Sequence, residues 1–549
     1  MNAVLSAAAS PLGVVALVCL AGAAAAAVLL RRSAVVVRFG VSLALLAVFV
    51  VLGGLSLSGA SAGGGRTQQA ALAASTPTPT SGQPKAPTPA QTQANAAALQ
   101  RAEEALTEAE RVANTGQGLQ ARDAFKRAAD LFRAAGDKAG EGRALLGRGR
   151  LEQRNGQGQQ ARDFYSQAEA LFVAAGDKGD LGRVLIARAE VEWQQFKAES
   201  ARDLYLQALT LLAGTNHLAD EATAEVGLMD AEWKLEHIIE ARRAATRAGA
   251  IAQVLGDTAG AASARRNLAD MAKIGDQDDG PRAELMDRLN EAIQLDDGNV
   301  KGGITLEMAN FDRDRGRLDL ARAGYNNAQA LYEDKRNESG AAQVMMARGD
   351  MLRATRTLGE AKGEYDRAAA LFKSAGDKVG SARVQTVLGQ LANWQDPHSR
   401  QMIAESAAAL TGVGDRQGVA YTVLALCSLD QSAANLDAAR EGCAKAYAEF
   451  LALGDWHGQG QALLVLADIA RDTEDRTGQE AKARQALALF EQKHYVVGEG
   501  FAHYAIGDAI VGKRPTDAKI EFLISASTFD GLGLRQLSDV SKARFTGTR

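Results

Sequence analysis

The sequence contains few cysteines and few prolines, and each scarcity excludes a class of protein. Three cysteines in 549 residues are too few for a disulfide framework. Only three of the nine prolines lie after residue 95, so that region is not made of irregular loops or many short strands. The net charge is −4 with no basic tract, which argues against nucleic acid as a partner. The hydrophobic content of 46% is too high for a largely disordered protein. With so few prolines in the body, a long helical array is the leading interpretation.

Residues 1–58 are predicted to form a membrane anchor. They contain two uncharged apolar runs, Leu12–Leu30 and Phe39–Ser58, of 19 and 20 residues, each long enough as a helix to cross a bilayer. Three arginines lie between the runs and no basic residue precedes them, so the positive-inside rule places the connector in the cytoplasm. A cleaved signal peptide is the alternative for the first run, but its basic residues would precede the apolar stretch.

Residues 59–95 have the composition of a disordered tether. They are rich in Gly, Ser, Ala, Thr, Pro and Gln, and their prolines favour an extended chain. The first 95 residues contain no acidic side chain and carry a charge of +5, whereas the remainder carries −9. We therefore expect an inner-membrane protein whose body, residues 96–549, lies on the periplasmic or extracytoplasmic side.

The body repeats itself about every forty residues. The dipeptide Gly-Asp recurs at separations of 40, 80, 120, 38 and 40, and this column divides the body into eleven units. Each unit has the apolar spacing of two helices, for example Leu181–Gln195 and Ser200–Ala213. The glycine suits the left-handed conformation after a helix, and the aspartate suits the N-cap of the next helix. The pattern predicts an all-α solenoid in which Pro281, Pro397 and Pro515 lie at the turns inside their repeats.

At the helix-packing positions the body resembles the tetratricopeptide repeat family, in a variant with a longer repeat. Small, small, aromatic and small residues occupy these positions in the second and seventh units: Gly149, Ala161, Tyr165 and Ala168, and Gly349, Ala361, Tyr365 and Ala368. Small residues let paired helices approach closely, and the ring fills the gap between them. The resemblance implies a right-handed α-solenoid of about eleven helical hairpins that binds protein or peptide partners.

In this family the first helix of each hairpin lines a concave groove, which implies a binding surface on the N-terminal repeats. The expected partner-binding residues are Arg143, Arg150, Arg154, Arg183, Glu190, Trp193, Asp230, Trp233 and Lys234. The arginines suit an acidic ligand or a C-terminal carboxylate. Trp193 and Trp233 either anchor a peptide or bury themselves between repeats. Asp350 and Arg353 are interpreted as an ordinary surface pair.

Several strings imitate catalytic signatures without their structural context. Residues 59–63 fit G-x-S-x-G but lie in the tether. Residues 507–513 fit the start of a phosphate-binding loop, but Arg514 and Pro515 follow, which indicates the end of a helix and a turn. The six histidines form no metal-binding motif. We therefore predict no enzyme activity, no cofactor and no metal site.

Cys427 and Cys443 fall at packing positions in the two helices of one repeat. Such positions ordinarily hold small residues, so two reduced core cysteines are the favoured interpretation. A disulfide is the alternative if the body lies outside the cytoplasm.

The predicted function is that of a membrane-anchored scaffold or assembly factor that binds partner proteins in its groove. The alternative is a sensor in which a small molecule or a cell-wall fragment changes the curvature of the superhelix.

Overall fold

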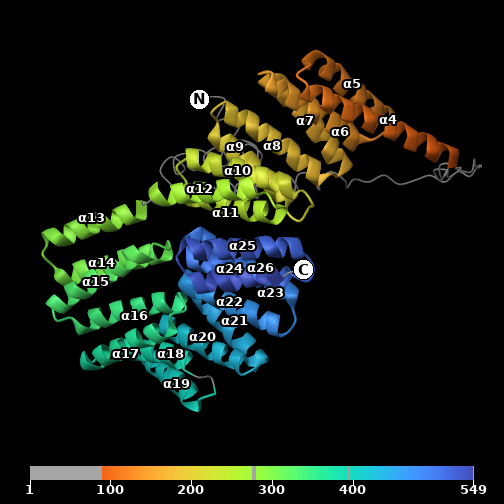
Figure 1. Cartoon of the computed structure of the whole chain (residues 1–549). Helices are drawn as coiled ribbons and strands as arrows, with labels where there is room; N and C mark the ends of the chain where they lie inside the picture. Colours follow the sequence, from red (N-terminus) through yellow and green to blue (C-terminus); the bar gives the residue numbers. More distant parts are fainter. Residues whose placement is uncertain (1–88, 275–279, 393–394, 548–549) are drawn as a thin grey trace, which may run out of the picture. The chain divides into compact units, whose positions relative to one another are not determined.

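A computed structural model of the chain describes residues 89–274, 280–392 and 395–547 (Figure 1). Within these ranges the chain forms twenty-three α-helices, numbered α4 to α26, and no strand. The predicted membrane segments and most of the predicted tether lie outside the described residues. No described helix is long and apolar enough to cross a bilayer.

The first twelve helices are α4 (Pro89–Asn114), α5 (Gly118–Ala135), α6 (Lys138–Arg154), α7 (Gly158–Ala175), α8 (Lys178–Gln194), α9 (Ala198–Leu212), α10 (Leu218–Lys234), α11 (Ile238–Leu255), α12 (Thr258–Ile274), α13 (Gly280–Gln294), α14 (Gly298–Asp314) and α15 (Leu318–Asp334). The other eleven are α16 (Glu338–Ala354), α17 (Leu358–Ser374), α18 (Lys378–Leu391), α19 (Pro397–Gly412), α20 (Arg416–Ser432), α21 (Leu436–Leu453), α22 (Trp456–Asp472), α23 (Arg476–Lys493), α24 (Val496–Ile510), α25 (Pro515–Gly531) and α26 (Arg535–Gly547).

The helices pack as successive hairpins, which confirms the predicted helical-repeat solenoid. Ten of the eleven predicted units are packed pairs, from α4 with α5 to α24 with α25, and α26 covers the last pair. The fifth unit differs, because α12 packs against α11 and α13 packs against α14. Residues 275–279, between these two helices, are outside the described part of the chain.

The Gly-Asp column ends one repeat and begins the next, as predicted. The six glycines all have a left-handed conformation, with φ between 68° and 75°. Each of the six aspartates accepts a hydrogen bond of 2.8–3.0 Å from the backbone N–H three residues ahead. A cap of this kind stabilises a helix by about 1 kcal/mol. Local sequence therefore sets the period of the solenoid.

Helix boundaries otherwise follow the expected positions, with one exception at the start. The predicted tether extends to residue 95, but α4 begins at Pro89, so residues 89–95 are helical. Proline is tolerated at a helix start, and the alanines and glutamines that follow favour helix. Pro397 and Pro515 likewise begin α19 and α25, as predicted. Gly507 lies in α24, which ends three residues later, so residues 507–513 are a helix end and a turn.

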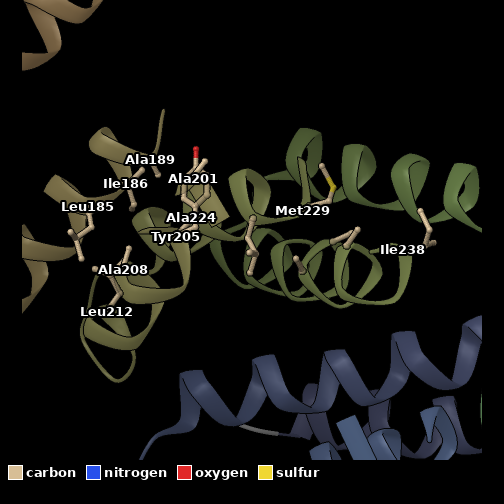
Figure 2. Packing of buried hydrophobic residues seen from close by; sticks show 14 of the residues in the cluster. Leu185, Ile186, Ala189, Ala201, Tyr205, Ala208, Leu212, Ala224, Met229 and Ile238 are labelled. Atoms are coloured by element: carbon tan, nitrogen blue, oxygen red, sulfur yellow. The ribbon is translucent and has the colours of Figure 1, made fainter. Parts of the chain in front are cut away.

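The core of a repeat joins a small residue of its first helix to an aromatic ring of its second. The side chains of Tyr165 and Tyr365 are completely buried. A Cβ atom added to Gly149 would lie 2.4 Å from Cε1 of Tyr165, and one added to Gly349 would lie 2.6 Å from Cε1 of Tyr365. Figure 2 shows an equivalent cluster in the third and fourth repeats, where Tyr205 packs among aliphatic side chains. The small and aromatic positions are thus packing positions.

One contact joins segments that are far apart in the sequence. Helix α11 packs against α25. Arg243 of α11 donates hydrogen bonds of 2.5 and 3.2 Å to the carboxylate of Glu499 in α24. The same guanidinium donates to the backbone carbonyl of Glu491, at 2.9 Å. The fourth repeat therefore contacts the last two repeats directly.

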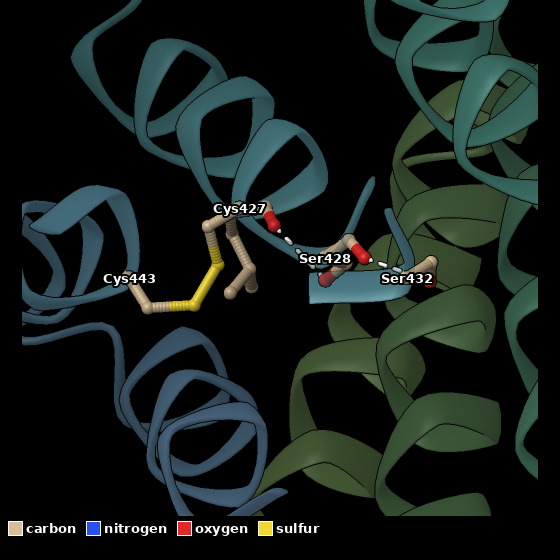
Figure 3. The surroundings of a disulfide bond; sticks show 5 residues. Cys427, Ser428, Ser432 and Cys443 are labelled. Atoms are coloured by element: carbon tan, nitrogen blue, oxygen red, sulfur yellow. Dashed lines mark hydrogen bonds between the residues drawn. A yellow bond between two sulfur atoms is a disulfide. The ribbon is translucent and has the colours of Figure 1, made fainter. Parts of the chain in front are cut away.

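Cys427 of α20 and Cys443 of α21 form a disulfide that joins the two helices of one hairpin (Figure 3). The favoured prediction of two reduced cysteines is therefore wrong. The Cα atoms lie 5.5 Å apart, within the usual range for a disulfide. The helices approach closely here because Gly442 has no side chain, and a Cβ at this position would lie 3.1 Å from the Cβ of Cys427.

The contact between Gly149 and Tyr165 predicts opposite effects for two glycine-to-alanine substitutions. Gly149→Ala should destabilise its hairpin by about 1–3 kcal/mol, because the added methyl group overlaps a buried ring. Gly363→Ala in α17 should stabilise its hairpin by about 0.5–1 kcal/mol, because nothing lies within 4 Å of the added Cβ. Amide hydrogen exchange of the two hairpins measures both effects. If both substitutions changed the stability of their hairpins equally and in the same direction, the contact between Gly149 and the ring of Tyr165 would be contradicted.

The disulfide predicts which thiols react in the unfolded, unreduced chain. Alkylation should label Cys19 alone, and labelling of all three cysteines would contradict the bond. Replacing Cys427 and Cys443 together by alanine should lower the stability of this hairpin by about 3 kcal/mol, because the bond closes a short loop in the unfolded chain. Mass spectrometry and hydrogen exchange measure the two results.

Candidate binding groove

A hollow of about 510 Å³ lies on the first helices of the first three repeats. Three of the expected partner-binding residues line it, namely Arg150, Arg154 and Glu190. Polar residues that sequence reasoning missed complete the lining: Glu110, Asn114, Gln153 and Gln194. The hollow thus combines two guanidinium groups with three side-chain amides and two carboxylates.

The arginines of this hollow are exposed and available to a ligand. Arg150 and Arg154 lie one turn apart near the end of α6. Neither forms an ion pair within 4.0 Å with any residue in the described ranges. Two guanidinium groups placed in this way suit bidentate hydrogen bonds to a carboxylate.

The floor of the hollow is connected to the core of the second repeat. The hydroxyl of Tyr165 donates a hydrogen bond of 2.6 Å to Oε1 of Gln153, which fixes this amide at the surface. Burial raises the pKa of Tyr165, so the phenol remains a donor. Burial also raises the pKa of Glu190, although the charge of Arg150 and a hydrogen bond from Gln153 act in the opposite direction.

Arg143 and Arg183, also expected in the groove, bind carboxylates of neighbouring repeats. Arg143 donates to Glu103 of α4 at 2.8 Å and lies 4.0 Å from a carboxylate oxygen of Asp180 in α8. Arg183 donates to Asp180 at 3.0 Å and to Asp220 of α10 at 2.7 Å. The structure thus places these two arginines in a ladder of ion pairs that links the first helices of four repeats.

The two expected tryptophans combine both interpretations that the sequence left open. Trp193 and Trp233 are each partly buried and pack against the cluster of the third and fourth repeats. Part of each ring therefore remains accessible to a partner. Asp230 and Lys234, on either side of Trp233 in α10, are exposed.

Phe196 is an exposed aromatic residue that sequence reasoning missed. It lies in the turn between α8 and α9, is 92% exposed, and has a φ of 62°. Three of the corresponding turns contain Gly116, Gly156 and Gly316, with φ between 75° and 78°, and four others contain Glu236, Arg356, Ala434 and Glu474, with φ between 60° and 66°. A side chain in this conformation costs about 1 kcal/mol, so Phe196 serves neither burial nor the turn. Among the described turns at this position, Phe196 is the aromatic residue, and this was the available signal.

A second hollow, of about 240 Å³, lies on the first helices of later repeats, α16, α18, α20 and α22. It contains Asp350 and Arg353, the residues interpreted as an ordinary surface pair. Their closest charged atoms are 3.8 Å apart, and each has a nearer partner. Asp350 accepts a hydrogen bond of 2.7 Å from Tyr365, and Arg353 donates one of 2.9 Å to Gln390. These residues therefore connect a repeat core to its neighbour.

Comparison with known proteins identifies the repeat type in part of the chain. Residues 140–213 match the tetratricopeptide repeat family model, and they lie in α6 to α9. The resemblance is therefore confirmed for the second and third hairpins, which include most of the hollow. No curated protein matches the chain.

Several solved structures show limited similarity. Yeast Tom70 is 13% identical, with 81% of this chain and 96% of that chain covered and a TM-score of 0.30. The apo form of RapI is 10% identical, with 56% and 98% covered and a TM-score of 0.26. A signal transduction ATPase with a tetratricopeptide repeat sensor, from Pyrococcus horikoshii, is 12% identical, with 69% and 54% covered and a TM-score of 0.29.

The raised pKa of Glu190 predicts a pH-dependent effect of Glu190→Gln. The folded state favours the protonated carboxyl of Glu190. The contribution of Glu190 to the free energy of unfolding of the wild type therefore falls as the pH rises from the ordinary glutamate range through the raised pKa. The variant should therefore gain stability over the wild type at pH 8, by about 1 kcal/mol or less, and lose this advantage at pH 5. Hydrogen exchange of α8 at both pH values measures the difference. Glu199→Gln, at the exposed start of α9, is the control, and an equal gain there would contradict the assignment to Glu190.

Proposed function

We propose that the chain is a membrane-anchored scaffold or assembly factor that binds a segment of a partner protein along its N-terminal groove. The observation that carries this proposal is the hollow in which Arg150 and Arg154 lie exposed beside side-chain amides. Amides of this kind bond the backbone of an extended peptide, and the arginines bond its carboxylate. The preferred segment is therefore acidic or ends in a free C-terminus.

Phe196 supplies an apolar anchor at the edge of this site. It follows Gln194, which lines the hollow, by two residues, and its N–H donates to the carbonyl of Trp193 at 2.9 Å. Exposed aromatic rings contribute strongly to protein interfaces because they bury a large area with little loss of side-chain freedom. We assign Phe196 and the accessible part of Trp193 to apolar residues of the partner.

The proposal places the repeats outside the cytoplasm, behind the two predicted membrane helices and the tether. The positive-inside bias of the three arginines between the apolar runs supports this orientation. The disulfide between Cys427 and Cys443 also supports it, because disulfides persist in oxidising compartments and are rare in the cytosol. The proposal assigns no catalytic step and no cofactor to the chain.

A substitution that strengthens the fold while it weakens binding tests this site. Phe196→Gly introduces the residue of three equivalent turns, and glycine adopts a positive φ without steric cost, so the substitution should raise the stability of the third hairpin by about 1 kcal/mol. It should also reduce partner capture by about tenfold, because the exposed ring is lost. Glu236→Gly, in the same turn of the next repeat with a φ of 66°, is the matched control and should stabilise without loss of capture.

Charge removal tests the other half of the site. The double variant Arg150→Gln and Arg154→Gln should lose the same partners as Phe196→Gly, whereas Arg322→Gln in α15 should retain them. Capture with the full-length chain, quantified by mass spectrometry, gives the comparison. An unchanged set of partners for both groove variants would place the binding site elsewhere.

A further inference from the structure

The second hollow lies on the first helices of four successive repeats, α16, α18, α20 and α22. None of the residues that line it also lines the hollow of the first three repeats. Its volume of about 240 Å³ is just below the range of about 300–1,000 Å³ that is typical of sites for drug-sized ligands. The hollow therefore suits a compact ligand of one ring.

The charged side chains of this hollow are paired with one another or with a neighbour. Arg353 lies 3.8 Å from Asp350 and donates to Gln390. Arg383 has two nitrogens within 2.7 Å of the same carboxylate oxygen of Asp415. An ion in the hollow would therefore meet no unpaired charge of opposite sign, and its loss of hydration would be uncompensated. These pairs favour an uncharged ligand.

His457 of α22 supplies a hydrogen-bond donor to the hollow. Its pKa is lowered, first by burial and then by the charge of Arg313, so the imidazole carries no charge at neutral pH. Nε2 of Gln461 lies 3.4 Å from Nδ1 of His457, and an amide nitrogen can only donate, so Nδ1 accepts and Nε2 carries the ring proton. Within the described ranges this N–H has no partner, and it is not fully buried. A ligand in the hollow can therefore accept a hydrogen bond from it.

Three glutamines of the lining each have one amide atom bonded and the other unbonded. Oε1 of Gln390 accepts from Arg353 at 2.9 Å. Nε2 of Gln417 donates to Asp455 at 2.9 Å, and Nε2 of Gln461 donates to the imidazole. In the part of the chain that the structure describes, no partner bonds the opposite atoms, which are one NH₂ group and two carbonyl oxygens. The existing bonds fix the three amides, so their unbonded atoms offer a donor and two acceptors at set positions.

An aromatic ring and three aliphatic side chains also line the hollow. The ring of Tyr421 is partly exposed and packs on Phe450, with the ring centres 4.7 Å apart. The aliphatic side chains are those of Met346, Val387 and Leu424. Covering this wall releases water from apolar surface, which favours binding. The ligand that fits the hollow therefore has an apolar face as well as polar groups.

An uncharged pyranose sugar has both kinds of surface. Each of its hydroxyl groups donates one hydrogen bond and can accept others, so the hydroxyls match the mixture of N–H and carbonyl groups in the hollow. Its ring C–H groups form an apolar face that can cover an aromatic ring. A hydrocarbon of the same size would leave the amides and the imidazole unpaired, at a cost for each group.

We propose that the second hollow binds one uncharged pyranose ring, with its hydroxyl groups on the three glutamines and His457 and its apolar face on Tyr421. Because the walls belong to four repeats, the bound sugar holds the seventh to tenth repeats together. This site goes beyond the proposed function, because it involves a different surface and a different class of ligand. The ring comes from one of two sources, a free sugar or the end of a glycan chain.

Saturation-transfer NMR and calorimetry on the full-length chain test the proposal. The free-sugar probes are methyl glucoside, methyl galactoside and N-acetylglucosamine, and the glycan probes are maltotriose and triacetylchitotriose. The matched controls are the uronate or the free amine of each sugar, which adds a charge, and cyclohexylmethanol, which lacks the ring hydroxyls. A neutral peptide, acetyl-Gly-Gln-Gly amide, tests the other class of ligand.

At least one sugar should bind, and each control should bind at least tenfold more weakly. A free sugar that binds as tightly as the glycan identifies the first source, and a glycan that binds more tightly identifies the second. Gln417→Leu, which removes an amide, and Tyr421→Leu, which removes the ring, should each weaken binding about tenfold. Gln431→Leu in the same helix removes an equivalent bond outside the hollow, that of Gln431 to Asp472 at 3.0 Å, and should bind normally.

The proposal is overturned if no sugar of the panel binds, if a charged control, cyclohexylmethanol or the peptide binds as tightly as the sugar, or if Gln417→Leu and Gln431→Leu bind equally well. If Tyr421→Leu fails to fold, the two glutamine variants and the probes still decide the outcome. Partner capture by the N-terminal groove is measured separately, so failure of one proposal does not imply failure of the other.

Discussion

The close approach of two helices through a small residue is the constraint on which this solenoid depends. Gly149 lies against the ring of Tyr165, and Gly349 lies against that of Tyr365. A methyl group at either glycine would overlap the ring, so the hairpin would have to open. Each hairpin presents a similar face to its neighbours, so the same fit sets the spacing of successive repeats.

The surface chemistry of the groove follows from this packing. The buried ring of Tyr165 extends its hydroxyl to Gln153 in the N-terminal hollow, and Tyr365 extends its hydroxyl to Asp350 in the second hollow. The polar floor of both hollows is therefore held by the core beneath it. Flexible arginines such as Arg150 remain at the surface, where a ligand can reach them. This arrangement combines a rigid floor with adaptable charges.

The predictability of the site varies from residue to residue. Arg150 and Glu190 were identifiable because they lie at a fixed phase on the first helices of their repeats. Arg143 also lies on the first helix of its repeat, but its guanidinium forms an ion pair with Glu103 of the preceding repeat. Phe196 was overlooked because aromatic residues usually lie in a core. Its position in the turn between α8 and α9 leaves the side chain exposed instead.

By itself, the sequence determined the helical repeat, its period and its caps, because Gly-Asp junctions and apolar spacing act between residues close along the chain. Only the tertiary structure decided that Cys427 reaches Cys443 and that Arg243 of α11 reaches Glu499 of α24. The disulfide depends on the close approach of α20 and α21 within one hairpin, whereas the contact of Arg243 with Glu499 depends on how the small rotations between successive repeats accumulate. No local spacing encodes that sum, so the contact between α11 and the last repeats has no signature in the sequence.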